Sequence, residues 1–247
     1  MPVEPLQPAF VLHRRAWRES SLLVELLTLE GGRVGVVARG ARRRRGPLAA
    51  CEPFVELQVA WRGRGELGQL VTAEPGGPGW RLHGDALFSG LYLNEVLLRL
   101  LRRHDPHPGL FSAYRETLAG LAAGAAVEPL LRRFERQLLD ESGYGLLLTE
   151  EAGNGVPIEP AASYRYDLEH GPVRVDGAQA GGLVLSGASL LALADGELHD
   201  ATVLAECKRL LRSALAPHLG PRPLRSRELF RRALATEAVK ADGPPRV

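Results

Sequence analysis

Two residue types are scarce in this sequence, and each shortage removes a class of function. Cysteine occurs only at Cys51 and Cys207, far apart among 247 residues. A disulfide framework is therefore not expected, and a four-cysteine zinc site within one chain is excluded. Lysine occurs only at Lys208 and Lys240. This shortage leaves no Gly-Lys-Ser/Thr loop of the kind that holds the phosphates of ATP or GTP.

Long apolar runs are also missing. No stretch reaches the roughly 18 residues that are needed to span a bilayer. The first ten residues, MPVEPLQPAF, contain no positively charged segment followed by an apolar one. With 45% hydrophobic residues, the chain can nevertheless bury the core of one large domain or of two to three small ones. We therefore expect a soluble, unprocessed, cytoplasmic protein that does not engage a membrane.

The net charge is only +2, but it is unevenly distributed. Residues 1–80 carry 11 arginines against 8 acidic groups, and residues 81–200 carry 10 basic against 17 acidic groups. Residues 201–247 carry 10 basic against 4 acidic groups. Arginine supplies 29 of the 31 basic residues. An anionic partner is therefore expected to meet the basic ends of the chain, whereas the acidic middle would repel it.

The first 75 residues alternate in the way that is typical of half-buried strands. In residues 33–39 the side chains of Val34, Val36 and Ala38 fall on one face. Similar strand patterns cover residues 9–14, 21–29, 55–61 and 67–73. Five short strands joined by turns predict a small closed barrel such as the OB fold. A split sheet or an SH3-like barrel fits the same pattern.

After residue 80 the apolar period changes to that of helices. Asp85 is the expected N-cap of a helix that runs to about Arg103. Further helices are expected over residues 108–123, 128–142, 187–194, 200–216 and 226–235. The sequence thus predicts an α+β protein with a five-stranded OB-fold barrel over residues 1–80, helical parts over residues 81–145 and 187–247, and a small metal-free hairpin or loop insertion over residues 146–186.

No motif supports catalysis or a cofactor. Residues 63–68 match G-x-G-x-x-G, but the dinucleotide motif requires a helix to follow, and the expected strand favours a hairpin turn instead. His104 and His107 are two potential metal ligands in a proline-rich connection, and without a further cluster a plain loop is favoured. No nucleophile is paired with a base. We therefore expect no catalytic residue, no cofactor and no bound metal.

Four consecutive arginines, Arg42–Arg45, follow the third expected strand. A charge run is usually a solvated loop, but here the preceding strand presents further arginines on one face, and more follow in a nearby turn. Arginines gathered on a small barrel form a groove that tracks phosphates, and aromatic rings stack on bases. Trp17 is the candidate for stacking, whereas Trp61 is expected in the core. The candidate DNA-binding residues of the barrel are Arg14, Trp17, Arg33, Arg39, Arg42, Arg43, Arg44, Arg45, Arg62 and Arg64.

The last two expected helices carry a second basic surface. Their cations recur at i,i+3 or i,i+4 spacing, so they share helix faces. These faces extend the DNA-binding surface in one interpretation, and in the other they only support solubility. The candidates are Lys208, Arg209, Arg212, Arg225 and Arg227.

Four stretches resemble a known family. The run AFVLHRRAWRESSLLVELLTLEGGRVGVVARGARRRR is similar to the N-terminal domain of the bacterial recombination mediator family RecO. The stretches LYLNEVLLRLL, LRRFERQLLDESGYG and RPLRSRELFRR resemble its helical portion. The match follows the same order over nearly the whole chain. It implies an N-terminal OB fold, a helical body, and a role in recombinational repair in the bacterial cytoplasm, with nucleoid association during repair.

The resemblance also implies partners. Members of this family bind single- and double-stranded DNA, anneal complementary strands, and act with RecR. They engage the tail of the single-stranded-DNA-binding protein and help RecA load onto the DNA that this protein covers, so RecA is an indirect partner. Some members carry a four-cysteine zinc module in the region of residues 146–185, where this sequence has no cysteine. Here we expect a metal-free hairpin held by Tyr164, Tyr166 and local turns.

The family's tail site is associated with the helical body, and the segment LRRFERQLL offers a matching pattern. The tail is acidic and ends in apolar residues with a free carboxylate, so its receptor needs an apolar pocket beside a guanidinium. The resemblance therefore implies Arg132, Arg136, Phe134 and Leu138 as partner-binding residues. In the alternative interpretation this is a surface helix in which Glu128 pairs with Arg132, and Arg136 pairs with Asp140.

Two other classes of function stay open. A Mg²⁺-dependent nuclease needs a cluster of carboxylates, which the spacing of the acidic residues does not assemble. An OB-fold RNA-binding or scaffold protein would share the same barrel. Affinity for single-stranded DNA against RNA, together with an annealing assay, separates these classes.

Overall fold

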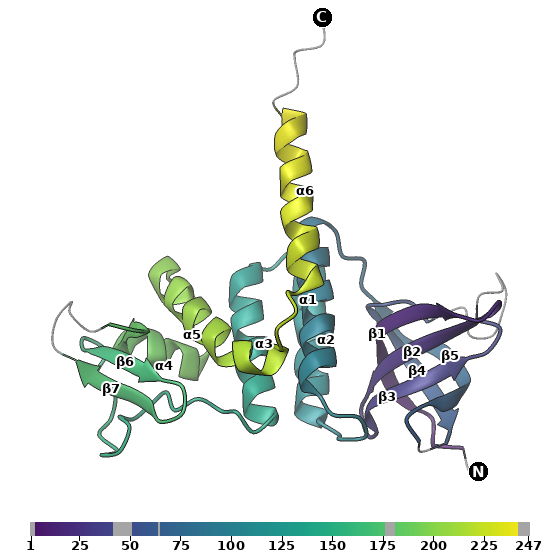
Figure 1. Ribbon diagram of the computed structural model, residues 1–247, viewed down its shortest axis with the longest axis horizontal. Helices are drawn as coiled ribbons and strands as arrows, with labels where there is room; N and C mark the ends of the chain where they lie inside the picture. Colours follow the sequence, from purple (N-terminus) through teal and green to yellow (C-terminus); the bar gives the residue numbers. More distant parts are fainter. Residues whose placement is uncertain (1–2, 42–50, 64, 176–180, 242–247) are drawn as a thin grey trace, which may run out of the picture.

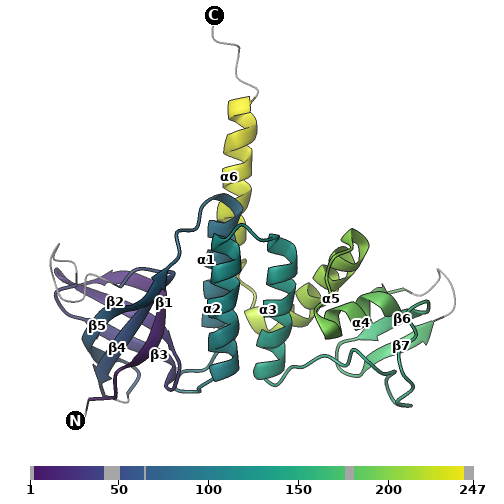
Figure 2. The same ribbon diagram turned by 180° about the vertical axis from the view of Figure 1, so that it is seen from behind.

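The computed structural model describes residues 3–41, 51–63, 65–175 and 181–241. A β-barrel forms one end of the molecule, helices form the middle, and a small three-stranded sheet forms the other end (Figures 1 and 2). The elements in chain order are β1 (Gln7–Trp17), β2 (Ser21–Thr28), β3 (Gly32–Ala38), β4 (Val55–Arg62), β5 (Gly68–Gly79), α1 (Gly84–Leu100), α2 (Pro108–Ala122), α3 (Val127–Glu141), β6 (Ser163–Asp167), β7 (Gly171–Val175), β8 (Val184–Ser186), α4 (Gly187–Asp195), α5 (Ala201–Leu219) and α6 (Arg225–Ala241).

The barrel is closed, with the strand order β1-β2-β3-β5-β4, which confirms the five-stranded prediction over a split sheet. Val34, Val36 and Ala38 of β3 point inward and are fully buried, as their alternation predicts. Trp61 is 3% exposed and also belongs to the barrel core. The G-x-G-x-x-G stretch connects β4 to β5, and these strands pair antiparallel. The expected hairpin connection is therefore confirmed.

Strand β1 is buried on both of its sides. Ala9 and Val11 belong to the core inside the barrel, whereas Phe10 and Leu12 belong to the core of the helical body. The ring of Phe10 lies 5.1 Å from that of Phe111 in α2. Full burial of a side chain of this size stabilises a fold by about 1.5–3 kcal/mol. The barrel is therefore packed against the helices through its own first strand.

A polar cluster fastens the barrel to the end of α1, and we call it the clamp. Glu25 of β2 pairs with Arg33 of β3 at 3.0 Å and with Arg103, and its side chain is only 8% exposed. The Arg33 guanidinium also donates to the carbonyl oxygens of Leu98 at 2.5 Å and Leu101 at 3.1 Å. These carbonyls lie at the C-terminal end of α1, in its last turn and at its C-cap, where an adjacent positive charge is favourable. The clamp thus joins two strands, a helix end and the loop that follows it.

Helix α1 is central and packs against α2, α3, α5, α6 and β1. It starts at Gly84, and its N-cap is His83, whose backbone is extended (φ −132°, ψ 158°). Asp85 lies in the first turn and is not the N-cap that the sequence predicts. The helix also ends at Leu100, before Arg103, because Arg103 belongs to the connection that docks on β3. No helix among the described residues is long and apolar enough to cross a membrane.

Two charged residues of α1 hold the connection between α5 and α6. Glu95 accepts hydrogen bonds from the backbone nitrogens of Arg225 at 3.0 Å and Ser226 at 2.9 Å, so it caps the start of α6. Arg99 donates to the carbonyl of Leu219 at the end of α5 at 2.9 Å and pairs with Glu95 at 2.6 Å. Burial opposes ionisation of Glu95, but the hydrogen bonds of Ser226 and Arg225 and the charge of Arg99 lower its pKa. The negative Glu95 lies at the N-terminus of α6 and the positive Arg99 lies at the C-terminus of α5, so each charge complements the dipole of that helix end.

The insertion forms a three-stranded sheet of order β7-β6-β8, matching the expected hairpin. Tyr164 is fully buried, and its hydroxyl accepts a hydrogen bond from the backbone nitrogen of Glu159 at 2.9 Å. Tyr166 is 5% exposed and donates to the carbonyl of Leu147 at 3.1 Å. Within the described ranges, no group of three or more His, Cys, Asp or Glu side chains is placed to hold a metal ion. Tyrosines pack and pin this module, as the sequence predicts.

The clamp yields a stability prediction. Removing one partner of a buried ion pair costs about 3–5 kcal/mol, but Arg33 and Arg103 are 19% and 31% exposed, so solvent screens part of the loss. We expect Glu25→Gln to lower the free energy of unfolding by about 2–3 kcal/mol. The control is Glu52→Gln, which breaks the exposed pair with Arg14, and we expect it to lose at most about 1 kcal/mol. Urea titrations measure both, and equal losses would show that the clamp is no stronger than a surface pair.

Candidate functional site

A row of residues crosses the outer surface of the barrel from β1 to β4. The strand register pairs Arg15 with Leu23, Leu23 with Val37, Val37 with Gln69, and Gln69 with Arg62. Paired residues point to the same side of a sheet. Because Val37 alternates with inward-pointing neighbours, this row faces outward. Arg15 and Arg62 stand at the two ends of this outward-facing row.

A second row lies beside the first. Trp17 pairs with Ser21 across β1 and β2, and Arg39 follows Ala38, the last residue of β3 in the register. Arg15, Arg39 and Arg62 are exposed, and Trp17 is half-buried. The guanidinium of Arg15 lies 5.8 Å from the centroid of the Trp17 ring. We call Arg15, Trp17, Arg39 and Arg62 the barrel face.

The charges of the barrel face are available to an anion. Among the described residues, no carboxylate pairs with Arg15, Arg39 or Arg62. Arg15 is missing from the candidates that the sequence suggests, although its period-two spacing from Trp17 is a usable signal. Arg42–Arg45 and Arg64 lie outside the described residues. The chain reaches the Arg42–Arg45 stretch directly from the barrel face, after Ala41.

Two predicted DNA-binding arginines need correction, because both are engaged within the protein. Arg14 pairs with Glu52 at 2.6 Å and donates to the carbonyl of Cys51 at 3.1 Å. A β-bulge between Val11 and His13 shifts the alternation of β1 by one residue, so Arg15 rather than Arg14 faces outward. Arg33 belongs to the clamp and contacts α1. Arg33 is therefore not available to a phosphate backbone, and Arg14 would first have to release Glu52.

The two cysteines are structural thiols. Burial raises the pKa of Cys51 to about 11 and that of Cys207 to about 12. At neutral pH both are therefore protonated, and a protonated thiol is a poor nucleophile and metal ligand. Cys51 belongs to the barrel core, and Cys207 belongs to the core of the helical body.

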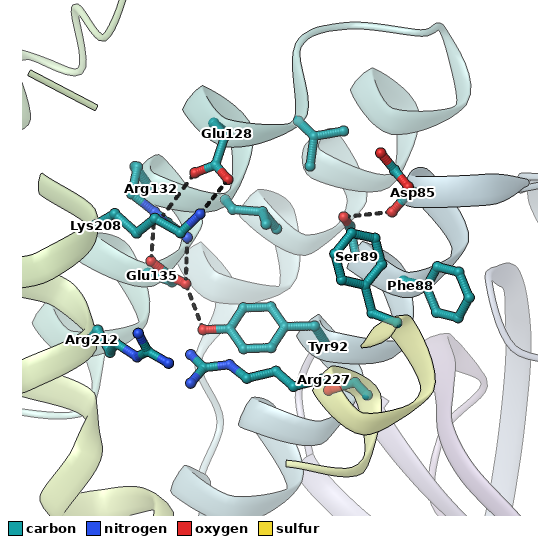
Figure 3. A pocket seen from close by; sticks show the side chains of 14 residues that line it. Asp85, Phe88, Ser89, Tyr92, Glu128, Arg132, Glu135, Lys208, Arg212 and Arg227 are labelled. Carbon is teal, nitrogen blue, oxygen red and sulfur yellow. Dashed lines mark hydrogen bonds and ion pairs between the residues drawn. The ribbon is translucent and has the colours of Figure 1, made fainter. Parts of the chain in front are cut away.

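A cavity of about 340 Å³ opens between α1, α3, α5 and α6, and we call it the helix pocket (Figure 3). One side is apolar, with Phe88 of α1 in an edge-to-face contact with Phe230 of α6 at 5.5 Å. The other side carries charges of both signs. The lining residues are Asp85, Phe88, Ser89, Tyr92, Val127, Glu128, Leu131, Arg132, Glu135, Lys208, Arg212, Ser226, Arg227 and Phe230.

The floor of the helix pocket is a buried polar network. Arg132 is 4% exposed and Glu135 is 3% exposed, and a nitrogen of Arg132 donates to Glu135 at 2.8 Å. The hydroxyl of Tyr92 donates to the same carboxylate at 2.5 Å. Burial raises the pKa of Glu135, although the charge of Arg132 lowers it. Arg132 also pairs with Glu128 at 3.3 Å, so its charge is compensated twice.

The partner-binding prediction on α3 needs correction at two of its four residues. Phe134 and Leu138 are 1% and 0% exposed in the core, so they cannot contact a partner. Arg136 donates to the carbonyls of Leu193 and Ala194 at the end of α4 and pairs with Asp140 at 3.3 Å. Of the four predicted residues, only Arg132 lines the helix pocket. Both ion pairs of the alternative interpretation are formed.

The structure brings three of the predicted C-terminal cations into the same pocket. Lys208, Arg212 and Arg227 line it. Arg209 instead donates to the carbonyl of Val184 at 2.8 Å, and Arg225 is exposed at the first residue of α6. Sequence spacing places these cations on helix faces, but it gives no sign that α5 and α6 meet α3 around one cavity.

Comparison with known proteins connects this architecture to a family. The family model for the Recombination protein O N terminal matches residues 1–78, and that for the Recombination protein O C terminal matches residues 81–228. The DNA repair protein RecO of Alkalilimnicola ehrlichii is 51% identical over 242 residues, which are 97% of this chain and 96% of that protein. The proteins of the same name from Halorhodospira halophila and Pseudomonas aeruginosa are 52% and 50% identical, covering 91% of this chain and 96% and 94% of their own lengths. The chain therefore belongs to the RecO family of DNA repair proteins.

Proposed function

We propose that this chain is a non-enzymatic DNA-binding mediator of recombinational repair. It binds single- and double-stranded DNA, anneals complementary strands and, together with RecR, helps RecA load onto DNA that the single-stranded-DNA-binding protein covers. The observation that carries the proposal is the barrel face, whose three exposed arginines have no carboxylate partner in the described part of the chain and one of which, Arg15, lies 5.8 Å from the ring of Trp17. Membership of the RecO family supports it.

The barrel face suits a nucleic acid backbone rather than a folded protein surface. Guanidinium groups neutralise phosphates and release counterions, and a half-exposed tryptophan offers a ring on which a base can stack. Neutralising phosphates on two strands lowers their mutual repulsion, and this allows complementary strands to pair. Arg42–Arg45 are proposed as further phosphate contacts, because they follow Arg39 closely in the sequence.

The helix pocket is the proposed receptor for the tail of the single-stranded-DNA-binding protein. Its apolar wall of Phe88, Val127, Leu131 and Phe230 accepts a terminal apolar side chain, and its cations attract an acidic peptide with a free carboxylate. Arg132 contributes to the floor of this pocket through its ion pair with Glu135. Because it compensates the buried carboxylate of Glu135, it positions the pocket floor rather than gripping the peptide.

Strand annealing without nucleotide tests the proposed function. The full chain is expected to accelerate pairing of two complementary oligonucleotides in the absence of ATP, because charge neutralisation needs no fuel, and added ATP should change nothing. Fluorescence quenching between labelled strands measures the rate, and a parallel titration compares single-stranded DNA with RNA of the same sequence. A requirement for ATP, cleavage of the DNA in Mg²⁺, or tighter binding of RNA would contradict the proposal.

The salt dependence of DNA binding locates the contacts. Each phosphate contact to a single strand contributes roughly 0.7 to the log–log slope of affinity against salt. Changing Arg15, Arg39 and Arg62 to alanine should therefore reduce the slope by about 2, and changing Arg42–Arg45 should reduce it by up to about 3. The matched control changes three arginines outside this surface: Arg102, Arg165 and Arg222. Equal slopes for the wild type and the barrel-face variant would exclude this face as the DNA-binding surface.

The apolar wall of the helix pocket can be tested with a single substitution. Leu131→Glu places a carboxylate in the wall, which repels an acidic peptide and removes apolar contact worth about 1.5–3 kcal/mol. We expect at least a tenfold loss of affinity for an acidic peptide with an apolar C-terminus, measured by fluorescence anisotropy, with annealing by the barrel unchanged. The control is Leu229→Glu, at a residue of α6 that is 47% exposed and does not line the pocket. Normal peptide binding by the Leu131 variant would place the tail elsewhere.

A further inference from the structure

The barrel closes at a short pairing between β3 and β5, which we call the seam. Its register pairs Val36 with Gly68 and Val37 with Gln69, and every other strand pairing of the barrel is longer among the described residues. The pair of Val37 and Gln69 also belongs to the outward-facing row that ends at Arg62. The place of Arg62 in the barrel face therefore depends on how firmly the seam is held.

The connection between α1 and α2 continues the seam along the edge of β3. Arg103 forms a parallel bridge with Arg33, and the backbone nitrogen of His104 donates to the carbonyl of Arg33 at 3.0 Å. Because β2 pairs along the other edge of β3, this connection and β5 share one edge, and both run parallel to β3. A segment of the helical body therefore completes the barrel beside the seam.

The side chains of this connection reach across β3 to the connection between β4 and β5. The guanidinium of Arg103 donates to the backbone carbonyl of Glu66 at 2.8 Å and also pairs with Glu25 of β2. The ring Nε2 of His104 donates to the carbonyl of Gly65 at 3.3 Å. A guanidinium presents several donors in a fixed plane, so Arg103 can hold two acceptors on different strands at once. The seam is thus fastened from the helical side.

Two glycines let β3 receive the connection this closely. A Cβ atom on Gly35 would lie 3.0 Å from a guanidinium nitrogen of Arg103 and 3.1 Å from the carbonyl oxygen of Glu66. A Cβ atom on Gly32, whose φ is +65°, would overlap the carbonyl of Asp105. Glycine tolerates both the close approach and the positive φ. The contact is therefore a built interface rather than a chance approach of two loops.

We propose that Arg103 is a positioning residue for DNA binding, which holds the connection between β4 and β5 so that Arg62 contacts a phosphate. The inference rests on the proposed function and deepens it, since it assigns part of the DNA-binding geometry to the helical body. Arg103 acts through Arg62 and does not itself contact the phosphate, because Glu25 and Glu66 engage its guanidinium. The grip of the barrel on DNA thus depends on its docking to the end of α1.

A double-mutant cycle in the full chain tests the proposal. A labelled single-stranded oligonucleotide is titrated at several salt concentrations, and binding is measured by fluorescence anisotropy. Arg103→Ala and Arg62→Ala should each lower the log–log salt slope by about 0.7, the value of one phosphate contact. The double variant should also lose about 0.7, because both changes remove the same contact. Arg103→Ala combined with Arg15→Ala should lose about 1.4, since Arg15 lies at the other end of the row.

The salt slope separates positioning from a general loss of stability. Arg103→Ala also breaks the clamp, but an unfolded fraction lowers the number of active molecules and not the number of phosphate contacts that each folded molecule makes. Arg103→Lys keeps a charge beside Glu25 but lacks the planar fork that reaches Glu66 at the same time. Its free energy of unfolding, measured by urea titration, should lie closer to the wild type than that of Arg103→Ala, with the slope still reduced by about 0.7. The matched control Arg102→Ala removes the exposed neighbouring charge and should keep the wild-type slope.

The outcomes distinguish failure of this inference from failure of the proposed function. If Arg62→Ala lowers the slope but Arg103→Ala or Arg103→Lys does not, the positioning role is wrong and the barrel face stands. A loss of about 1.4 in the double variant of Arg62 and Arg103 would make Arg103 a phosphate contact of its own, and an equal loss in Arg102→Ala would show a general charge effect. Either result overturns the inference alone. A wild-type slope for Arg62→Ala would contradict both the inference and the proposed barrel face.

Discussion

The architecture depends on the burial of β1 on both of its sides. Because successive side chains of a strand point to opposite faces, Ala9 and Val11 close the inside of the barrel while Phe10 and Leu12 enter the core of the helical body. A slip of one residue would exchange these sets, so the position of the barrel against the helices is fixed together with the register. Past the bulge, the same strand leaves the helices, and Arg15 and Trp17 become part of the outer surface. One strand therefore docks the barrel on the helices and also contributes Arg15 and Trp17 to the barrel face.

Much of the fold could be predicted from the sequence, because its determinants are local. Period-two alternation places Val34, Val36 and Ala38 inside the barrel, and glycine ends α3 at Gly143 with a positive φ of 80°. The hairpin is expected from the glycines and the two tyrosines of residues 146–185, and Tyr164 and Tyr166 are buried in it. The β-bulge in β1 could not be predicted in this way. It inserts one residue into β1 against the neighbouring strand β2, no glycine or proline in the bulge marks it, and it exchanges the roles of Arg14 and Arg15.

The candidate sites were harder to predict, because the role of an arginine depends on its partners rather than on its spacing. Arg33, Arg39 and Arg132 look alike in a sequence rich in arginine. In the fold, Arg33 is held by Glu25 and by helix carbonyls, and Arg132 is held by a buried carboxylate, whereas Arg39 has no carboxylate partner among the described residues. Only tertiary contacts between distant segments separate a charge that builds the protein from one that is left for a ligand. The helix pocket could not be predicted from the sequence either, because it forms only where α1, α3, α5 and α6 pack together.

The capping of α6 by Glu95 has a consequence for how tightly the helix pocket can bind. A helix usually carries its own N-cap residue and can fray or reorient independently of its neighbours. Here the first turn of α6 is bonded to a side chain of α1, which also forms the opposite wall of the cavity. The start of α6 is therefore tied to α1 when the chain folds. Little further ordering is required when a ligand arrives, so more of the contact energy is expressed as affinity.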